Sequence, residues 1–270
     1  MDKRNFFLGI GLAIVLVFFF AALYTGLSRT ADTSADRENL YQVSTIDALM
    51  QGVYDGVQPV SELKKHGDFG IGTFDSLDGE MIALDGKYYH ARSDGTVVPA
   101  QDTQTTPFAT VTYFDRDFSE PTSHTLNLSE FSSEMSEKLP TRNMIYAIRI
   151  DGTFPSVKVR AIPPQQKPYP SLSDAAKNQL VYTYKNATGT VVGFYTPDFV
   201  KGLNVVGYHL HFISDDRKTG GHILDFVVPA GTSVTYDATA GFTMALPTRG
   251  DFTGVDLSGD LSGELAKVEQ

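Results

Sequence analysis

The segment GYHLHFISDDRKTGGHILDF, residues 207–226, constrains the fold of this chain more than any other stretch. Its first eight residues alternate as in a β-strand, so His209 and His211 point to the same face of a sheet. The following DDRKTG is rich in turn-forming residues, and a second strand begins at Gly221. We therefore predict a β-hairpin that sets His222 opposite His211.

This hairpin gathers three of the six histidines of the chain within 14 residues. Cross-strand neighbours lie about 5 Å apart at Cβ, close enough for three imidazole nitrogens to reach one ion at about 2 Å. We predict that His209, His211 and His222 bind one divalent metal ion and leave coordination positions open, as in catalytic zinc sites. Three imidazoles also accept Mn, Fe, Co or Ni. The simpler alternative is an ordinary hairpin that happens to carry histidines.

Composition removes several functional classes. The formal net charge of -10 and the absence of a basic excess argue against a nucleic-acid partner. The chain has no cysteine, so any metal must be held by nitrogen and oxygen. It also lacks the GxSxG motif of serine hydrolases.

The N-terminus predicts export. Lys3 and Arg4 precede an apolar run from Phe6 to Leu27, and no charge follows Arg4 until Arg29. We interpret residues 1–36 as a signal peptide, and we expect secretion after cleavage. The run is also long enough to cross a bilayer, so an uncleaved N-terminal membrane anchor is the alternative.

The remaining chain predicts an α+β fold, with two sheet-rich halves of mixed β-sheet, a few helices and the metal site on the C-terminal half. Helical spacing is expected over 43–54, 129–139 and 171–184, and a β-meander with Asp-Gly turns over 67–100. Further strands are expected within 109–114, 144–152, 190–197, 204–214, 221–230 and 234–246. The proline-rich segment 163–172 cannot form a helix, so we divide the fold into an N-terminal domain, 37–162, and a C-terminal metal-binding domain, 163–270.

Two blocks resemble the α-acetolactate decarboxylase family: GYHLHFISDDRKTGGHILDF and, upstream, GIGTFDSLDGEMIALDGKYY. The resemblance runs from about Tyr41 to Glu269. It implies zinc, one ion per chain, on His209, His211 and His222, and it implies a homodimer.

The resemblance also assigns residues that the local pattern alone would leave unremarked. It implies catalytic roles for Glu80, in TFDSLDGEM, for Arg160, in VKVRAIPP, and for Glu269 near the C-terminus. Thr73 would lie beside them as a substrate-binding residue, together with Arg160. Glu264 is the nearby alternative to Glu269.

These residues imply a carboxy-lyase that converts 2-acetolactate, a small 2-hydroxy-3-oxo acid, to acetoin and CO2. In this hypothesis the metal polarises the ketone and stabilises the enediolate that CO2 leaves behind. Arg160 guides the carboxylate through its planar guanidinium. Either Glu80 or Glu269 supplies the proton, and the sequence does not decide between them.

Two other functions compete with this one. A cupin-type metal dioxygenase or isomerase also carries HxH on one strand and a later histidine, but Asp216 stands where a cupin glutamate ligand is expected. A non-enzymatic metal- or sugar-binding β-module would use the histidines as a closed site with a fourth protein ligand.

Overall fold

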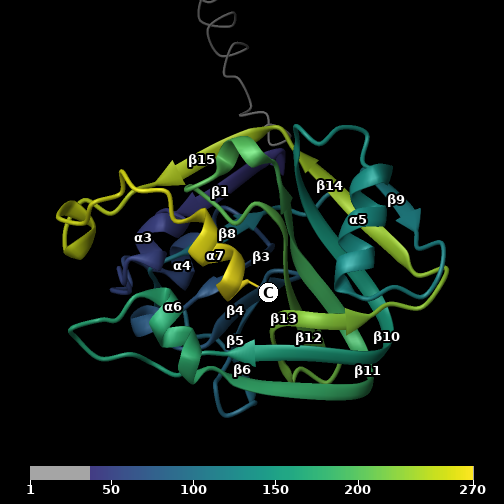
Figure 1. Cartoon of the computed structure of the whole chain (residues 1–270), viewed down its shortest axis with the longest axis horizontal. Coiled ribbons are helices and arrows are strands. Elements are labelled where there is room, and N and C mark those ends of the chain that lie inside the picture. Colours follow the sequence, from purple (N-terminus) through teal and green to yellow (C-terminus); the bar gives the residue numbers. More distant parts are fainter. Residues whose placement is uncertain (1–36, 270) are drawn as a thin grey trace, which may run out of the picture. The chain divides into compact units, whose positions relative to one another are not determined.

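The computed structural model describes residues 37–269, whose strands form two large β-sheets (Figure 1). The predicted signal peptide or anchor at 1–36 lies outside the described residues. Within residues 37–269, none of the helices is both long and apolar enough to cross a membrane. The fold is rich in strands with few helices, as predicted.

The first sheet has seven strands. Their order is β15 (Gly241–Ala245), β1 (Asn39–Val43), β8 (Ala109–Thr112), β3 (Phe69–Thr73), β4 (Glu80–Leu84), β5 (Lys87–Ala91) and β6 (Val97–Pro99). The pairing of β1 with β15 is parallel and the others are antiparallel, so the sheet is mixed. The predicted meander over 67–100 is confirmed as β3 to β6, with Asp85 and Gly86 at positive φ in one of its turns.

The second sheet has six strands. Their order is β11 (Leu180–Thr196), β12 (Gly207–Ser214), β13 (Gly220–Val227), β10 (Ile145–Ala161), β14 (Ser233–Thr239) and β9 (Phe118–Pro121). Because β10 also pairs with β11, the strands β10, β11, β12 and β13 close into a ring. A separate two-stranded sheet joins β2 (Gln58–Pro59) to β7 (Thr105–Thr106).

Short helices fill the remaining connections. They are α3 (Ile46–Met50), α4 (Val60–Leu63), α5 (Leu128–Lys138), α6 (Leu172–Ala175) and α7 (Ser262–Val268), with 3-10 turns η1 (Asp75–Leu77), η2 (Ala176–Asn178), η3 (Asp198–Val200) and η4 (Asp251–Thr253). The predicted helix over 129–139 is confirmed as α5, which begins with a capping box between Asn127 and Glu130.

Two predicted helices are wrong in part. The segment 43–54 forms only the five-residue α3, because Val43 ends the strand β1. The segment 171–184 starts at the predicted serine cap, Ser171, but LVYTY belongs to β11. There the pairing with β10 decides the conformation. This pairing is a long-range contact, which the spacing of apolar residues in the local sequence does not reveal.

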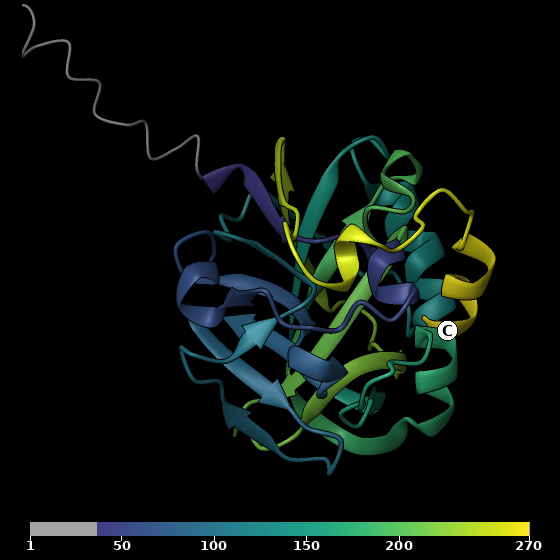
Figure 2. The same ribbon diagram turned by 90° about the vertical axis from the view of Figure 1, so that its left-hand side faces the viewer.

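Figure 2 shows the fold turned by 90°, and one of its hydrophobic clusters lies between the two large sheets. Phe69 and Ile71 of the first sheet pack against Phe194 and Ile213 of the second. The sheets do not divide at the predicted boundary, residue 163. The strand β10 precedes this residue but pairs with β11, β13 and β14, which follow it. The strand β15 follows it but joins the first sheet. The division into domains 37–162 and 163–270 stays a prediction.

Candidate active site

The predicted hairpin register is confirmed, because His211 of β12 lies directly opposite His222 of β13. His209, two residues along the same face, brings its Nε2 to 3.2 Å from Nδ1 of His222. One nitrogen from each ring lies within 4.8 Å of the others, and the three residues are at most 8% exposed. The alternation of β12 and the turn after it therefore bring three imidazoles together.

A close approach of β13 to β10 adds an arginine to this group. Arg160 of β10 pairs with His222, and Gly221 beside it has φ of +149°. A Cβ at Gly221 would come within 2.5 Å of the Arg160 carbonyl oxygen, so only glycine lets the two strands lie this close.

The guanidinium of Arg160 is buried and faces the C-terminus. Its Nη1 donates to the carbonyl oxygen of Val268 at 2.8 Å and to Oε1 of Gln179 at 3.3 Å, and its Nη2 donates to Oε1 of Glu269 at 3.1 Å. Sequence reasoning missed Gln179 and the Val268 carbonyl. Nothing in the local sequence marks them, since their role comes from where α7 packs.

Glu269 reaches the histidines from the end of α7, which docks through the buried Leu265 and Val268. Its Oε2 lies 3.6 Å from Nε2 of His209 and 3.5 Å from Nε2 of His222. Glu264, the alternative from the sequence, is exposed on the same helix. Of these two glutamates, the structure brings Glu269 into the site.

The first sheet contributes the remaining predicted residues. Glu80, the first residue of β4, has its Oε2 3.7 Å from Nε2 of His211. Thr73 pairs with Glu80 across β3 and β4, and its hydroxyl donates to the carbonyl oxygen of Gly79 at 2.7 Å. All seven predicted site residues therefore lie in one place, where the two sheets meet.

Burial controls the protonation of this group. It raises the pKa of the Glu80 carboxyl to about 7; Arg160 opposes this rise and Glu269 adds to it. Burial also lowers the pKa of His209, and it holds those of His211 and His222 well below the usual range. The three imidazoles are therefore neutral near pH 7, the state in which histidine binds metals.

Hydrogen bonding leaves ring nitrogens free to bind a metal. Nδ1 of His211 lies 3.1 Å from the Met81 carbonyl oxygen, which can only accept, so Nδ1 carries the proton and Nε2 keeps its lone pair. Within residues 37–269, Nε2 of His211, Nε2 of His222 and Oε2 of Glu269 are buried without a hydrogen-bond partner. Such atoms fit a bound cation. Sequence reasoning missed Met81, which acts through its backbone.

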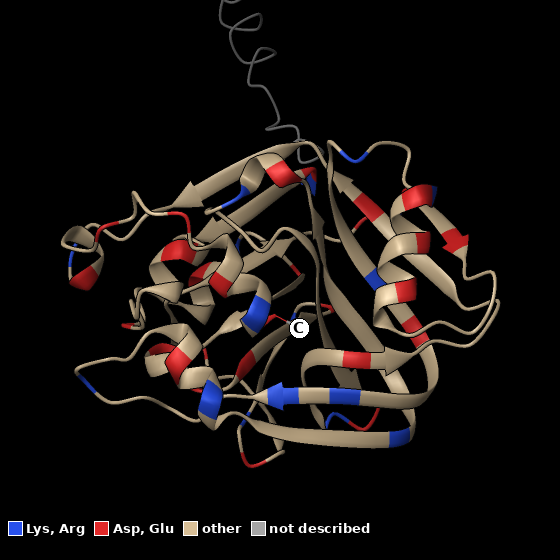
Figure 3. Ribbon diagram, in the orientation of Figure 1, with Lys and Arg blue, Asp and Glu red and all other residues tan. Residues whose placement is uncertain are grey.

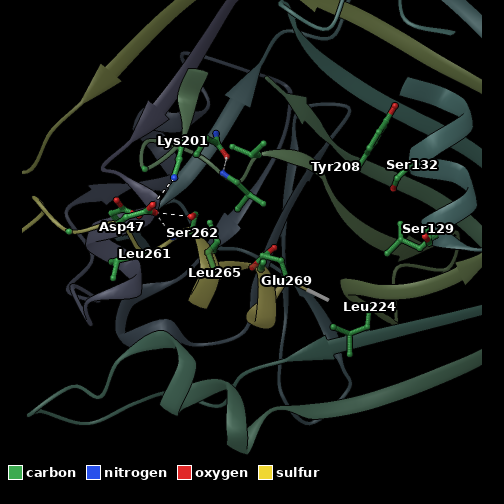
Figure 4. Close-up of a pocket in the computed structure, with 18 of the residues that line it drawn as sticks. Asp47, Ser129, Ser132, Lys201, Tyr208, Leu224, Leu261, Ser262, Leu265 and Glu269 are labelled. Atoms are coloured by element: carbon green, nitrogen blue, oxygen red, sulfur yellow. Dashed lines mark hydrogen bonds and ion pairs between the residues drawn. The ribbon is translucent and has the colours of Figure 1, made fainter. Parts of the chain in front are cut away.

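Two cavities adjoin the site. A small one of about 30 Å³ is lined by Thr73, Glu80, Arg160 and two of the histidines. A larger one of about 1100 Å³ lies between α7 and α5, and Figure 4 shows Leu265 and Glu269 facing Tyr208 and Ser132 across it. Glu269 lines both cavities, so it stands between the histidines and the open space.

The fold and the site together have the arrangement of a catalytic centre that can hold one metal ion: three converging neutral imidazoles beside an arginine and two carboxylates. Comparison with known proteins then identifies the family. The profile of the alpha-acetolactate decarboxylase family matches residues 40–259. The chain belongs to this family.

Individual relatives point to the same family. The chain is 53% identical over 231 residues to an alpha-acetolactate decarboxylase of Methanosarcina mazei, covering 86% of this chain and 80% of that protein. The corresponding Bacillus subtilis protein is 44% identical over 85% of this chain and 90% of its own length. A solved structure of the B. subtilis enzyme superposes with a TM-score of 0.82 at 42% identity, over 86% of this chain and 99% of that one.

Membership of this family confirms the prediction of an enzyme of the carboxy-lyase class. It also decides against the cupin and non-enzymatic alternatives, both of which rested on the histidines alone.

Proposed function

We propose that this chain converts 2-acetolactate to acetoin and CO2 at a zinc ion held by His209, His211 and His222. The observation that carries the proposal is the convergence of three buried, neutral imidazoles with Arg160, Glu80 and Glu269, in a chain of the alpha-acetolactate decarboxylase family. The named relatives are enzymes of this reaction, which supports the same substrate here.

The donor set fits zinc. Three imidazole nitrogens with no sulfur ligand suit Zn2+ and leave coordination positions for a substrate. The unpaired Nε2 atoms of His211 and His222 point to a cation rather than to a protein partner within residues 37–269. When bound there, the metal supplies Lewis-acid chemistry that polarises the ketone of the substrate.

Arg160 is suited to hold the substrate carboxylate. Its guanidinium is 4% exposed and aligned by Gln179 and Val268, and its partner Glu269 is itself a carboxylate. A substrate carboxylate can therefore take the place of Glu269 at Nη2, while Nη1 stays bound to the Val268 carbonyl oxygen. Binding in this position orients the bond that breaks, between the carboxylate carbon and the carbinol carbon.

Glu80 is suited to deliver the proton. Loss of CO2 leaves an electron pair on the carbon next to the ketone, and one proton on that carbon completes acetoin. Glu80 lies on the opposite sheet from Arg160 and faces His211, and burial favours its protonated form. After donating, the carboxylate regains a proton from water.

The small cavity is too narrow for the substrate as it stands, with room for about one or two water molecules. We propose that Glu269 and the end of α7 move aside toward the larger cavity when the substrate enters. The shared position of Glu269 in both cavities supports this route.

The test is anaerobic conversion of racemic acetolactate, with acetoin, CO2 and bound metal measured in one sample. We expect acetoin and CO2 in equal amounts and about one zinc per chain. His211→Ala should lose metal and turnover together, whereas His124→Ala, a change at an exposed histidine in the loop between β9 and α5, should lose neither. Absence of acetoin from the metal-loaded protein would refute the proposed reaction.

We further propose that the chain is exported and acts as a homodimer. The charged N-terminus followed by an apolar run supports export, and the family resemblance supports the dimer. Sequencing the N-terminus of secreted protein tests the first, because cleavage should remove the apolar run. Light scattering tests the second, and a monomer at micromolar concentration would contradict it.

A further inference from the structure

A second cluster of metal-binding groups lies away from the histidines, at the other end of β10. It consists of Glu38, immediately before β1, Asp117, in the loop between β8 and β9, and Asp237, on β14. One carboxylate oxygen from each lies within 4.8 Å of the others. Asp237 is opposite Ala147 near the start of β10, whereas Arg160 is near the end of that strand.

Asp237 is fully buried, and only one of its two carboxylate oxygens has a hydrogen-bond partner within residues 37–269. Its Oδ2 accepts a hydrogen bond from the backbone N–H of Asp115 at 3.2 Å, but its Oδ1 has no partner within residues 37–269. A buried carboxylate oxygen without a partner is costly unless a cation lies beside it.

The surrounding charges increase this cost. Arg37 pairs with Asp115 at 3.6 Å, and in the described part of the chain no basic side chain pairs with Glu38, Asp117 or Asp237. Figure 3 shows how acidic segments outnumber basic ones over the structure. Burial, together with the nearby carboxylates of Glu38, Asp117 and Asp115, raises the pKa of Asp237 to about 7, and the N–H of Asp115 opposes this rise.

The fold holds these carboxylates in place. The N–H of Asp117 donates to the Tyr236 carbonyl oxygen at 3.0 Å, and the N–H of Ala238 donates to Oδ2 of Asp117 at 2.8 Å. Glu38 is fixed through its carbonyl oxygen, which accepts from the N–H of Gly241 at 2.7 Å. The three like charges are therefore brought together by backbone pairing and cannot simply separate.

We propose that Glu38, Asp117 and Asp237 form a binding site for a calcium ion. All donors are carboxylate oxygens, which select Ca2+ or Mg2+ over the softer metals that imidazole binds. Calcium takes oxygens at about 2.3–2.6 Å, so two of its ligands lie at most about 5 Å apart, and it tolerates water on an exposed side. Asp117 is exposed, which leaves that side open.

The bound ion acts as a structural link. It joins the beginning of β1 in the first sheet to β14 in the second, with the β8–β9 loop between them. Neutralising Asp237 removes the penalty for burying its charge, so calcium stabilises the fold without taking part in the reaction.

The experiment uses the full chain with the histidine site already loaded with zinc. Calcium chloride is titrated in by calorimetry, and the unfolding temperature is compared with that in sodium chloride of equal ionic strength. We expect one calcium site per chain and a rise of about 5–10 °C at a hundredfold excess over Kd. No binding heat and no rise up to 10 mM, which is about ten times the Kd of the weakest calcium modules, would overturn the proposal.

Variants assign the effect to these residues. Asp237→Asn should unfold at a higher temperature than the wild type without calcium, because the buried charge is gone, and should lose the response to calcium. Asp117→Asn, a change at an exposed position that leaves the core intact, should lose the response as well. Asp215→Asn, in the β12–β13 turn, should keep it. A calcium response retained in both Asp237→Asn and Asp117→Asn would refute the site.

Discussion

Arg160 connects the parts of the site, since its guanidinium contacts the C-terminal residues and its backbone pairs with His222. Its two terminal nitrogens form a fork that contacts Val268 and Glu269. A lysine cannot reproduce this fork, because an ammonium is a single point of charge. The identity of this one side chain therefore matters beyond its positive charge.

Arg160→Lys tests the fork. We expect kcat/KM to fall about 100-fold with the zinc content unchanged, because carboxylate orientation is lost and the imidazoles are not. Arg149→Lys is the matched control, since Arg149 pairs with Asp85 and Asp151 on the surface. Equal losses in both variants would mean that the loss does not come from the fork at this position.

Glu269→Gln, compared with Glu264→Gln, separates the two glutamates of α7. Glu269 contacts Arg160 and two histidines, whereas Glu264 is exposed. Because a carboxylate beside two metal-binding imidazoles supports their hold on the metal, we expect the metal affinity and kcat of the first variant to fall about 10- to 100-fold and those of the second to stay within about twofold. Steady-state kinetics with a metal measurement decides, and an equal effect of both changes would remove Glu269 from the mechanism.

At the scale of elements, the sequence predicts the hairpin β12–β13 but not the pairing of β13 with β10. Alternation of residues has a period of two, and a short turn fixes which residues face each other, so the pairing of His211 with His222 followed from local sequence. The pairing of β13 with β10 joins residues about 60 positions apart, and no local pattern encodes it. For this reason only the family resemblance points to Arg160 as a site residue.

The C-terminal element shows the same limit. The segment DLSGDLSGELAKVE carries only a loose pattern, which leaves both Glu264 and Glu269 as candidates. Burial of Leu265 and Val268 decides which face of α7 meets the sheets, and that burial is a property of the packed molecule. Helical spacing likewise misassigns the first residues of the long strand β11, because their pairing with β10 is a long-range contact.

Gly221→Ala tests how closely β13 must approach β10. A Cβ would press on the Arg160 carbonyl at 2.5 Å, so we expect a loss of about 1–3 kcal/mol of stability and a fall in activity as His222 and Arg160 shift. Gly231→Ala is the control, because Gly231 also has positive φ but no atom of residues 37–269 lies within 4 Å of its Cβ position. Thermal unfolding and kinetics of both variants separate the steric contact from backbone strain, and equal effects would rule out the contact.

At the scale of the whole molecule, the site depends on both sheets at once. Glu80 and Thr73 come from the first, the histidines and Arg160 from the second, and Glu269 from a helix that follows β15. Because β10 and β15 cross between the halves of the sequence, neither 37–162 nor 163–270 holds a complete set of these residues. We therefore expect activity only from a chain that carries both.

Removing residues 1–36 tests whether folding and activity depend on them. The family match begins at residue 40, β1 begins at Asn39, and all seven site residues lie between Thr73 and Glu269. A chain that starts at Arg37 should therefore keep the kcat and unfolding temperature of the full chain, since it also retains Glu38. In a bacterial host the full chain should be recovered outside the cytoplasm and the shortened chain inside it, as cell fractionation measures. Loss of folding in the shortened chain would show that residues 1–36 contribute to the enzyme itself and not only to its export.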